Sequence, residues 1–257
     1  MAVILGGNDT LPQIALTESQ TFVPPQDGTV MIHVIGAGGG GMGSGEISYK
    51  NGGGAGGYCR KNALAVTTAG SFTVVIGAGA TGSTNDGAGG NGGNSTVAGT
   101  GLSATLTANG GTGATARNNT GGAGGTFGGG AVGVYGTGNA GSSATNGASQ
   151  GGGDSDALGV PSMSGFGHIV GGYGGKMIEV NTNSVTGNRP SNNNDGDFLA
   201  GGGAFFAIDS AGIRSVVYGG RGGNGGGGGG VANKSEHHDS RGGNGGDGLV
   251  LIQYLPS

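Results

Sequence analysis

The chain has 257 residues, of which 72 are glycine and 6 are proline, roughly the content at which low complexity or disorder becomes the usual expectation. Only 33% of the residues are apolar and 5% are aromatic, with no tryptophan, so an ordinary side-chain core would be thin for this length. Charged residues make up 9% and the formal net charge is -4, which leaves no basic surface to neutralise the phosphates of a nucleic acid. We therefore do not expect DNA or RNA as partners.

The segment from Met1 to Phe22 lacks the glycine repeats that follow it. Its apolar start reaches Gly6 and Gly7 too early for a signal-peptide core, and no apolar run approaches membrane-spanning length, so we expect a soluble chain. Because no glycine register surrounds Ile14 or Leu16, we expect residues 1–22 to attach the chain to another protein or to sister chains. The alternative is that they form a strand of a terminal β-layer. Residues 23–257 are predicted to form one glycine-rich domain.

Ordinary strand signals occur in four places. These segments are rich in β-branched and aromatic residues and are bounded by Gly, Pro or Asp: Thr29 to Ile35, Tyr58 to Thr67, Ser71 to Ile76 and Leu249 to Tyr254. Three lie near the amino end, and the fourth, residues 249–254, closes the chain. We expect them to form a small β-layer from the two ends of the chain, which buries the few large apolar residues together.

Between Gly77 and Gly248 the recurring pattern is Gly-Gly-X, with a period of three. It occurs as Gly89 to Asn94, Gly121 to Thr126 and Gly219 to Asn224. No window there has a helical period, so essentially no α-helix is expected. Three residues per turn is the geometry of the left-handed extended helix, whose N–H and C=O groups all point outward. The predicted fold class is therefore a mainly irregular, all-β protein with a bundle, or sandwich, of polyglycine II helices.

Ordering glycine costs more backbone entropy than ordering any other residue, so one such helix cannot be stable alone. Several must stack and hydrogen-bond to one another. The polar, non-glycine stretches between them are predicted to be long loops, where binding usually resides. They are Ala131 to Gln150, Asp154 to Val170, Lys176 to Ala200, Ala204 to Tyr218 and Val231 to Arg241.

Several motifs suggest chemistry that their context does not support. Gly36, Gly38 and Gly41 match the GxGxxG fingerprint of dinucleotide-binding proteins, but no helix follows to hold a pyrophosphate. The run Glu236 to Asp239 contains two adjacent histidines, which rarely bind one ion, and is interpreted as an exposed loop tip. The lone Cys59 is interpreted as a packed thiol.

A catalytic nucleophile with a base, or a paired set of carboxylates, is not found. Asp195 and Asp197 resemble part of a calcium loop but lack its closing Glu, and His33 is expected to be a packed histidine. We expect no enzymatic activity, no cofactor and no metal.

The chain resembles the glycine-rich domain of bacteriophage tail fibre proteins, including the receptor-binding tip adhesins of T-even-type long tail fibres. The residues that carry the resemblance are Val23 to Gly28 leading into Val30 to Gly38, then Gly53 to Tyr58, Phe72 to Gly79, and Gly245 to Ile252. The resemblance implies a non-enzymatic adhesin at the distal tip of the virion's tail fibre. Loops on a rigid polyglycine bundle would then bind an outer-membrane protein or a surface glycan of the host, and residues 1–22 would contact another tail fibre protein or sister chains.

Large side chains in the longest loops are the candidate receptor-binding residues, because aromatic and Arg residues contribute a disproportionate share of interface energy. They are Tyr135, Phe166, His168, Arg189, Phe198, Phe205, Phe206, His237 and His238. For the phenylalanines the alternative is packing in small cores beneath the loops. The alternative function is that of a non-catalytic structural glycine-rich protein, such as an ice-binding protein; a disordered glycine-rich matrix protein is a further rival.

Overall fold

The computed structural model describes residues 13–43, 51–84, 87–114, 219, 221–230 and 241–256, together with the backbone of several strands outside these ranges. Those strands are β1 (Ala2–Leu5), β9 (Phe127–Gly129), β10 (Tyr135–Gly136), β11 (Ile178–Asn181), β12 (Phe205–Ile208), β13 (Val217–Tyr218), β14 (Val231–Asn233) and β15 (Ser240–Arg241). None of the described residues is helical, so the predicted all-β class is confirmed for this part of the chain. It also contains no helix that could span a membrane.

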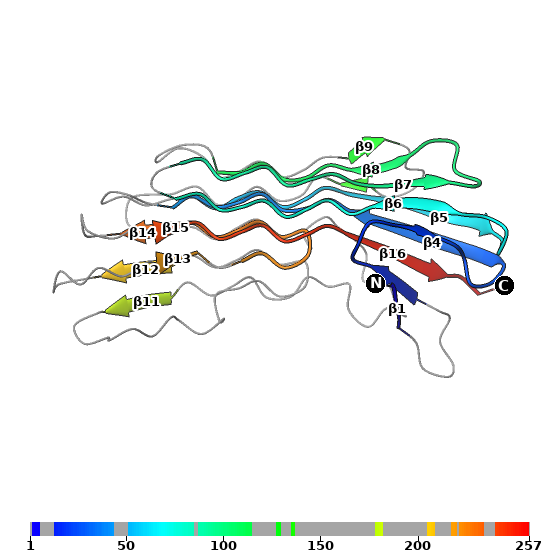
Figure 1. The fold of residues 1–257 in the computed structure, drawn as a ribbon, viewed down its shortest axis with the longest axis horizontal. Helices are drawn as coiled ribbons and strands as arrows, with labels where there is room; N and C mark the ends of the chain where they lie inside the picture. Colours follow the sequence, from blue (N-terminus) through cyan, green and yellow to red (C-terminus); the bar gives the residue numbers. More distant parts are fainter. Residues whose placement is uncertain are drawn as a thin grey trace.

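Two antiparallel sheets form one end of the molecule, which we call the sandwich (Figure 1). The first sheet has the strand order β1-β2-β16-β4-β5-β10, with β2 (Gln13–Leu16), β16 (Leu249–Tyr254), β4 (Gly28–Ile35) and β5 (Tyr58–Val66). The second has the order β3-β6-β7-β8-β9, with β3 (Gln20–Phe22), β6 (Phe72–Val75), β7 (Ser95–Gly99) and β8 (Leu106–Ala108). The expected β-layer from both ends of the chain is therefore present.

The hydrophobic core lies between these two sheets. Because side chains alternate along a strand, Val30, Ile32 and Val34 of β4 all face the core, where each is at most 1% exposed. From the opposite sheet, Phe72 stacks on Phe22 with ring centroids 6.5 Å apart. Among the residues with described side chains, most of the large buried apolar residues are thus concentrated here.

The described strands of the amino-terminal segment, β1, β2 and β3, belong to the sandwich. Strand β2 pairs with β16 in the register Ile14↔Ile252, and Leu16 is fully buried in the core. The β-layer that we considered as the alternative for this segment is therefore observed. Because removing β2 would uncover β16, we expect deletion of residues 1–17 to unfold the sandwich.

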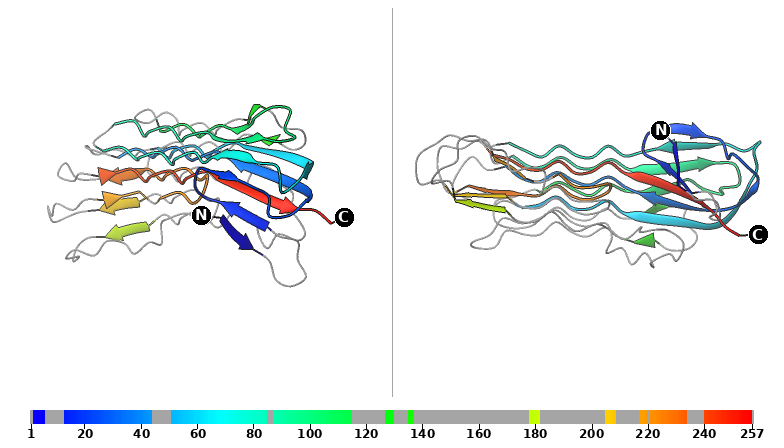
Figure 2. Two further views of the ribbon diagram at one scale, coloured as in Figure 1. Left: turned by 45° about the vertical axis from the view of Figure 1, so that its right-hand side comes forward. Right: turned by 90° about the horizontal axis from the view of Figure 1, so that it is seen from below.

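Glycine-rich segments extend from the sandwich and run side by side, a region that we call the bundle (Figures 1 and 2). Its described parts are residues 36–43, 51–57, 77–84, 87–94, 109–114, 219–230 apart from 220, and 242–248. Strand β4 continues directly into 36–43, and segment 242–248 leads directly into β16. The same extended chain therefore passes from sheet pairing to bundle pairing without a break.

The segment from Gly36 to Met42, which we call the central segment, is bonded to neighbours on all sides. Its successive N–H groups donate to three different segments, through the carbonyls of Gly57, Gly93 and Gly246, and three residues later to the same segments through Gly54, Gly90 and Gly243. Its carbonyls accept from three further segments, through the N–H groups of Gly111, Ala80 and Gly228. This three-residue repeat of partners is the pattern expected of stacked extended helices with three residues per turn.

Close approach of backbones explains the glycine content of the central segment. A Cβ on Gly38 would lie 1.9 Å from the carbonyl oxygen of Gly226, and one on Gly39 would lie 2.1 Å from that of Thr112. By contrast, a Cβ on Gly90 would meet nothing closer than 3.4 Å. Glycine is therefore required where two backbones touch and not at every position of the repeat.

Side chains at X positions complete the backbone bonding at the surface of the bundle. The side-chain oxygens of Asn91, Asn94, Asn244 and Asp247, which we call the amide caps, accept hydrogen bonds from the N–H groups of Gly113, Gly110, Gly82 and Gly79 at 2.7–3.0 Å. Their carbonyl and carboxylate oxygens replace the backbone acceptor that a further neighbouring segment would supply.

At the end opposite the sandwich, the far end, the structure contains short parallel strands (Figure 1). Strand β12 lies between β11 and β14, and β13 pairs with β15. These strands fall in stretches that we expected to be loops throughout. Parallel pairing of neighbouring segments thus continues past the glycine repeats.

Candidate functional site

The two ends of the molecule differ in what they carry. The strands from both chain ends lie in the sandwich, as the positions of the N and C labels show (Figure 2). At the far end lie the parallel strands β11, β12 and β14 (Figure 1). These three strands are therefore held away from the sandwich strands that belong to both chain ends.

The candidate receptor-binding residues are divided between these ends. Phe205 and Phe206 lie in β12 at the far end, where they pair with Ile178 and Glu179 of β11. Tyr135 lies in β10, paired with Cys59 at the edge of the first sheet, so the length of the bundle, about 20 Å for a seven-residue extended segment, separates it from them. Outside the described residues lie Phe166, His168, Arg189, Phe198, His237 and His238.

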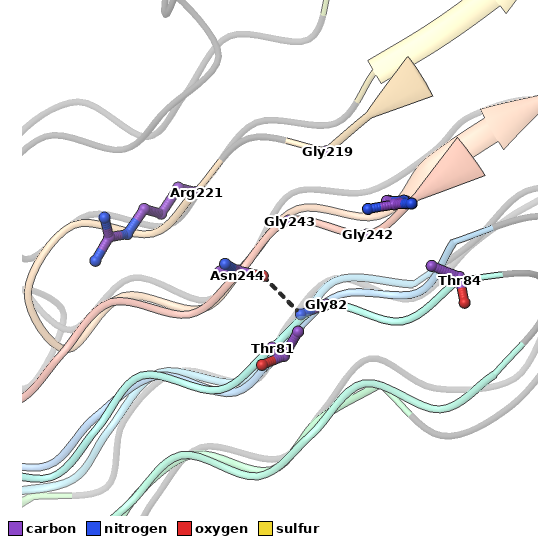
Figure 3. A pocket seen from close by; sticks show the side chains of 9 residues that line it. Thr81, Gly82, Thr84, Gly219, Arg221, Gly242, Gly243 and Asn244 are labelled. Carbon is purple, nitrogen blue, oxygen red and sulfur yellow. Dashed lines mark hydrogen bonds between the residues drawn. The ribbon is translucent and has the colours of Figure 1, made fainter. Parts of the chain in front are cut away.

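A groove of about 340 Å³ lies on the side of the bundle close to the far end (Figure 3). Segments from distant parts of the sequence meet there, and its lining consists of Thr81, Gly82, Thr84, Gly219, Arg221, Arg241, Gly242, Gly243 and Asn244. The residues that line this groove were not predicted from the sequence as a site.

Backbone pairing fixes the position of each lining segment. The N–H groups of Gly219, Gly222 and Gly225 donate to the carbonyls of Arg241, Asn244 and Asp247, so residues 219–225 run parallel to residues 241–247. On the other side, Thr84 forms an antiparallel bridge with Arg241. The groove is thus formed by three backbones whose register is set by hydrogen bonds.

A repeated motif, Arg-Gly-Gly-Asn-Gly-Gly, supplies both arginines of the groove. It occurs at residues 221–226 and again at 241–246. Within its first copy the chain reverses in a tight turn, in which the N–H of Gly226 bonds to the carbonyl of Gly223 and Gly225 has a φ of 73°. This exact repeat within a Gly-Gly-X run is the sequence signal by which the groove residues could have been found.

The polar groups of the groove are held in place by hydrogen bonds and an ion pair. Arg221 lies 3.5 Å from Asp247, whose other carboxylate oxygen accepts the N–H of Gly79 at 2.7 Å. The ion pair is more than half exposed, so solvent screens most of its energy. Asn244 accepts the N–H of Gly82 through Oδ1, the dashed line in Figure 3, which leaves its Nδ2 group as a donor. The hydroxyls of Thr81 and Thr84 also line the groove.

A second polar cluster is buried on the first sheet. His33 Nδ1 lies 2.8 Å from the hydroxyl of Tyr58, and His33 is 1% exposed. Burial, and then the positive charge of Arg60, lowers the pKa of His33 to about 3, while burial raises the pKa of Tyr58 above its ordinary value. The predicted packed histidine is therefore confirmed, and its imidazole is neutral at physiological pH.

Cys59 is fully buried in the sandwich core, and burial raises the pKa of its thiol to about 12. Reactive cysteines have lowered pKa values and partial exposure, so the interpretation as a packed thiol is confirmed. Among the described residues no three His, Cys, Asp or Glu side chains form a metal-binding group. The run Glu236 to Asp239 lies outside them.

The glycines of the GxGxxG match do not form a phosphate-binding loop. The N–H groups of Gly36, Gly38 and Gly41 donate to the carbonyls of Gly57, Gly246 and Gly243 at 2.9 Å. No helix begins at this segment. The N–H groups that would bind a pyrophosphate are thus already hydrogen-bonded to neighbouring segments of the bundle.

Comparison with known proteins identifies a family for this chain. The model of a family described as a glycine-rich domain matches residues 15–255, from within β2 to the residue after β16. No curated protein gives a significant match. The match covers both the sandwich and the bundle. The chain therefore belongs to the glycine-rich domain family.

Proposed function

We propose that this chain is a receptor-binding protein at the tip of a bacteriophage tail fibre. Its far end binds an outer-membrane protein or a surface glycan of a bacterium, and its sandwich end, which includes residues 1–22, joins another tail fibre protein or sister chains. The observation that carries the proposal is the separation of the two ends by the bundle: strands from both chain ends lie at one, and the short parallel strands β11, β12 and β14 lie at the other (Figure 1).

The physical argument is one of preorganisation. A binding surface loses less conformational entropy on association when the segments that carry it are already held in place. Around the central segment, hydrogen bonds to six neighbouring segments fix the backbone. A stretch that connects two such segments is therefore fixed at both of its ends. The bundle then holds it at a distance from the sandwich end, by which the chain is attached.

The proposal is tested by adsorption of the labelled full chain to a panel of bacterial strains. We expect saturable binding to a subset of strains and competition with a phage that uses the same receptor. Phe205→Ala and Phe206→Ala should each reduce binding by about tenfold if these residues are among the dominant contacts. Thr73→Ala, at an exposed position of β6 in the sandwich, is the control and should bind like the parent.

Melting curves of all variants establish that each is folded. Adsorption to no strain, together with measurable thermal hysteresis, would favour an ice-binding role instead. If Thr73→Ala abolishes adsorption while every folded far-end variant binds like the parent, the receptor surface lies on the sandwich and the proposed orientation is wrong.

A further inference from the structure

The groove on the side of the bundle is lined by two positively charged side chains. Arg221, in the bundle, and Arg241, in the adjoining β15, are the only Lys or Arg side chains among the described residues outside the sandwich. Since the chain as a whole has a formal net charge of -4, two guanidinium groups on one side of the bundle make this a local site for an anion.

The floor of the groove is backbone without side chains. Gly82, Gly219, Gly242 and Gly243 contribute it, so a ligand can approach the main chain closely. Their Cα methylene groups offer small apolar surfaces between polar groups. Such a floor suits a flat ligand whose own surface alternates C–H and hydroxyl groups.

The walls supply hydrogen-bonding groups of several kinds. Thr81 and Thr84 provide hydroxyls that both donate and accept, and Asn244 provides an amide donor that is oriented by its own bond to Gly82. Guanidinium groups match carboxylate and phosphate oxygens, with which they form charge-assisted hydrogen bonds.

We propose that this groove binds an acidic saccharide, a sugar chain that bears carboxylate or phosphate groups. Arg241 and Arg221 each contact an anionic group of the sugar chain, and the Thr hydroxyls and the Asn244 amide contact sugar hydroxyls. The inference rests on the proposed function, because it names a class of cell-surface ligand for the bundle side, next to the far end. The residues that would contact this ligand line the groove, and none of them is among the candidate receptor-binding residues predicted from the sequence.

The groups present favour an acidic sugar over two simpler ligands. A neutral sugar has no group that requires the two guanidinium groups. A free inorganic anion would use the guanidinium groups but neither the Thr81 hydroxyl nor the glycine floor. Asp247 beside Arg221 reduces the local positive charge, which weakens the attraction for an anion with no further contacts.

The test is calorimetric and NMR titration of the full chain with three probes: oligogalacturonate, a malto-oligosaccharide of equal length, and inorganic phosphate. We expect oligogalacturonate to bind at least about tenfold more tightly than either of the others, with chemical-shift changes at Thr81, Gly82 and Gly243. A phosphorylated mannose oligosaccharide distinguishes phosphate from carboxylate as the preferred anionic group.

Variants separate a specific site from general attraction of charge. Arg241→Gln should weaken oligogalacturonate binding by about tenfold, on the order expected for one lost charge-assisted hydrogen bond. Thr81→Val keeps the shape of the side chain and should weaken binding by a smaller factor, and only for saccharides. Lys61→Gln, which removes the same charge from β5 in the sandwich, is the matched control and should change affinity less than twofold.

Failure of this inference is distinguishable from failure of the proposed function. Absence of oligogalacturonate binding, equal loss with Lys61→Gln, or shifts confined to residues outside the groove would overturn the inference. If Arg241→Gln adsorbs to bacteria like the parent, the groove has no part in recognition of the bacterium, and the proposed receptor-binding function still stands. If the chain binds the saccharide tightly but adsorbs to no strain, the groove is a saccharide site and the proposed receptor-binding function is wrong.

Discussion

The sandwich and the bundle bury their backbones by opposite means. In the sandwich, Leu16, Ile32 and Leu106 are fully buried between two sheets, so the two sheets are held apart by interlocking side chains. In the bundle, the central segment is equally buried but has no large side chain before Met42, and its neighbours touch backbone to backbone. One chain thus uses hydrophobic area at one end and dense amide pairing at the other.

This difference predicts opposite responses to side-chain volume, and the largest effect is expected in the bundle. Gly38→Ala would place a methyl group 1.9 Å from the carbonyl oxygen of Gly226, which forces two backbones apart. We expect a loss of at least about 4 kcal/mol in the free energy of unfolding, measured by denaturant titration. Gly90→Ala, with no contact closer than 3.4 Å, is the matched control and should change stability by less than about 1 kcal/mol. Equal effects would mean that close backbone contact does not hold the bundle together.

In the sandwich, removal of volume should be the damaging change. Leu106→Ala empties a fully buried position between the sheets and should cost about 3 kcal/mol in the free energy of unfolding. Val75→Ala shortens a side chain that is 42% exposed on the same sheet and should cost less than about 1 kcal/mol. A similar cost for both variants would show that the sheets do not enclose a packed core.

The stability of the sandwich should depend on pH through His33. The folded pKa of His33 is lowered to about 3, below its ordinary value of 6.5. The folded state therefore resists the proton that the unfolded state accepts, so stability is full above pH 6.5 and falls between pH 6.5 and 3. The slope is about 1.4 kcal/mol per pH unit, or about 2 kcal/mol lost by pH 5.

Urea titrations at pH 7, 6 and 5 measure this slope, and a His33→Leu variant should lack it whatever its absolute stability. Restricting the range to pH 5 and above keeps the ordinary titration of carboxylates small. A slope retained by His33→Leu would assign the pH dependence to other groups.

The smallest effect concerns the surface of the bundle. Asn91→Ala removes the acceptor of the buried Gly113 N–H and should cost about 1 kcal/mol in the free energy of unfolding. Asn91→Asp keeps an oxygen acceptor and should retain most of that stability. A larger loss for Asp than for Ala would show that the amide caps do not act through this hydrogen bond.

The sequence predicted best those features that arise from local patterns. The β-branched and aromatic residues from Leu249 to Tyr254 predicted β16 with its observed bounds, and the three-residue period of glycine predicted the three-residue repeat of hydrogen-bond partners. Strands β3 and β8 were not predicted, because each has only three residues and little apolar alternation. Their pairing is decided by the core that they cover and not by their own residues.

The groove and the amide caps could not be predicted, because both depend on which segments become neighbours. Thr81 and Asn244 are far apart in the sequence and meet only through the register of the bundle. Gly-Gly-X repeats are nearly interchangeable, so the pattern does not indicate which segments pair. The position of Tyr135 at the sandwich end was missed for the same reason.

The direction of the bundle's hydrogen bonds has a mechanical consequence. They join neighbouring segments sideways, so a pull along the long axis between the sandwich and the far end loads them in shear. The central segment is held by several bonds to more than one neighbour: Gly38 and Gly41 donate to Gly246 and Gly243 of one segment, and Gly39 donates to Gly54 of another. Sliding one segment past the rest requires these bonds to break together, whereas peeling would break them one at a time. The bundle should therefore resist extension along its axis far better than its small hydrophobic content suggests.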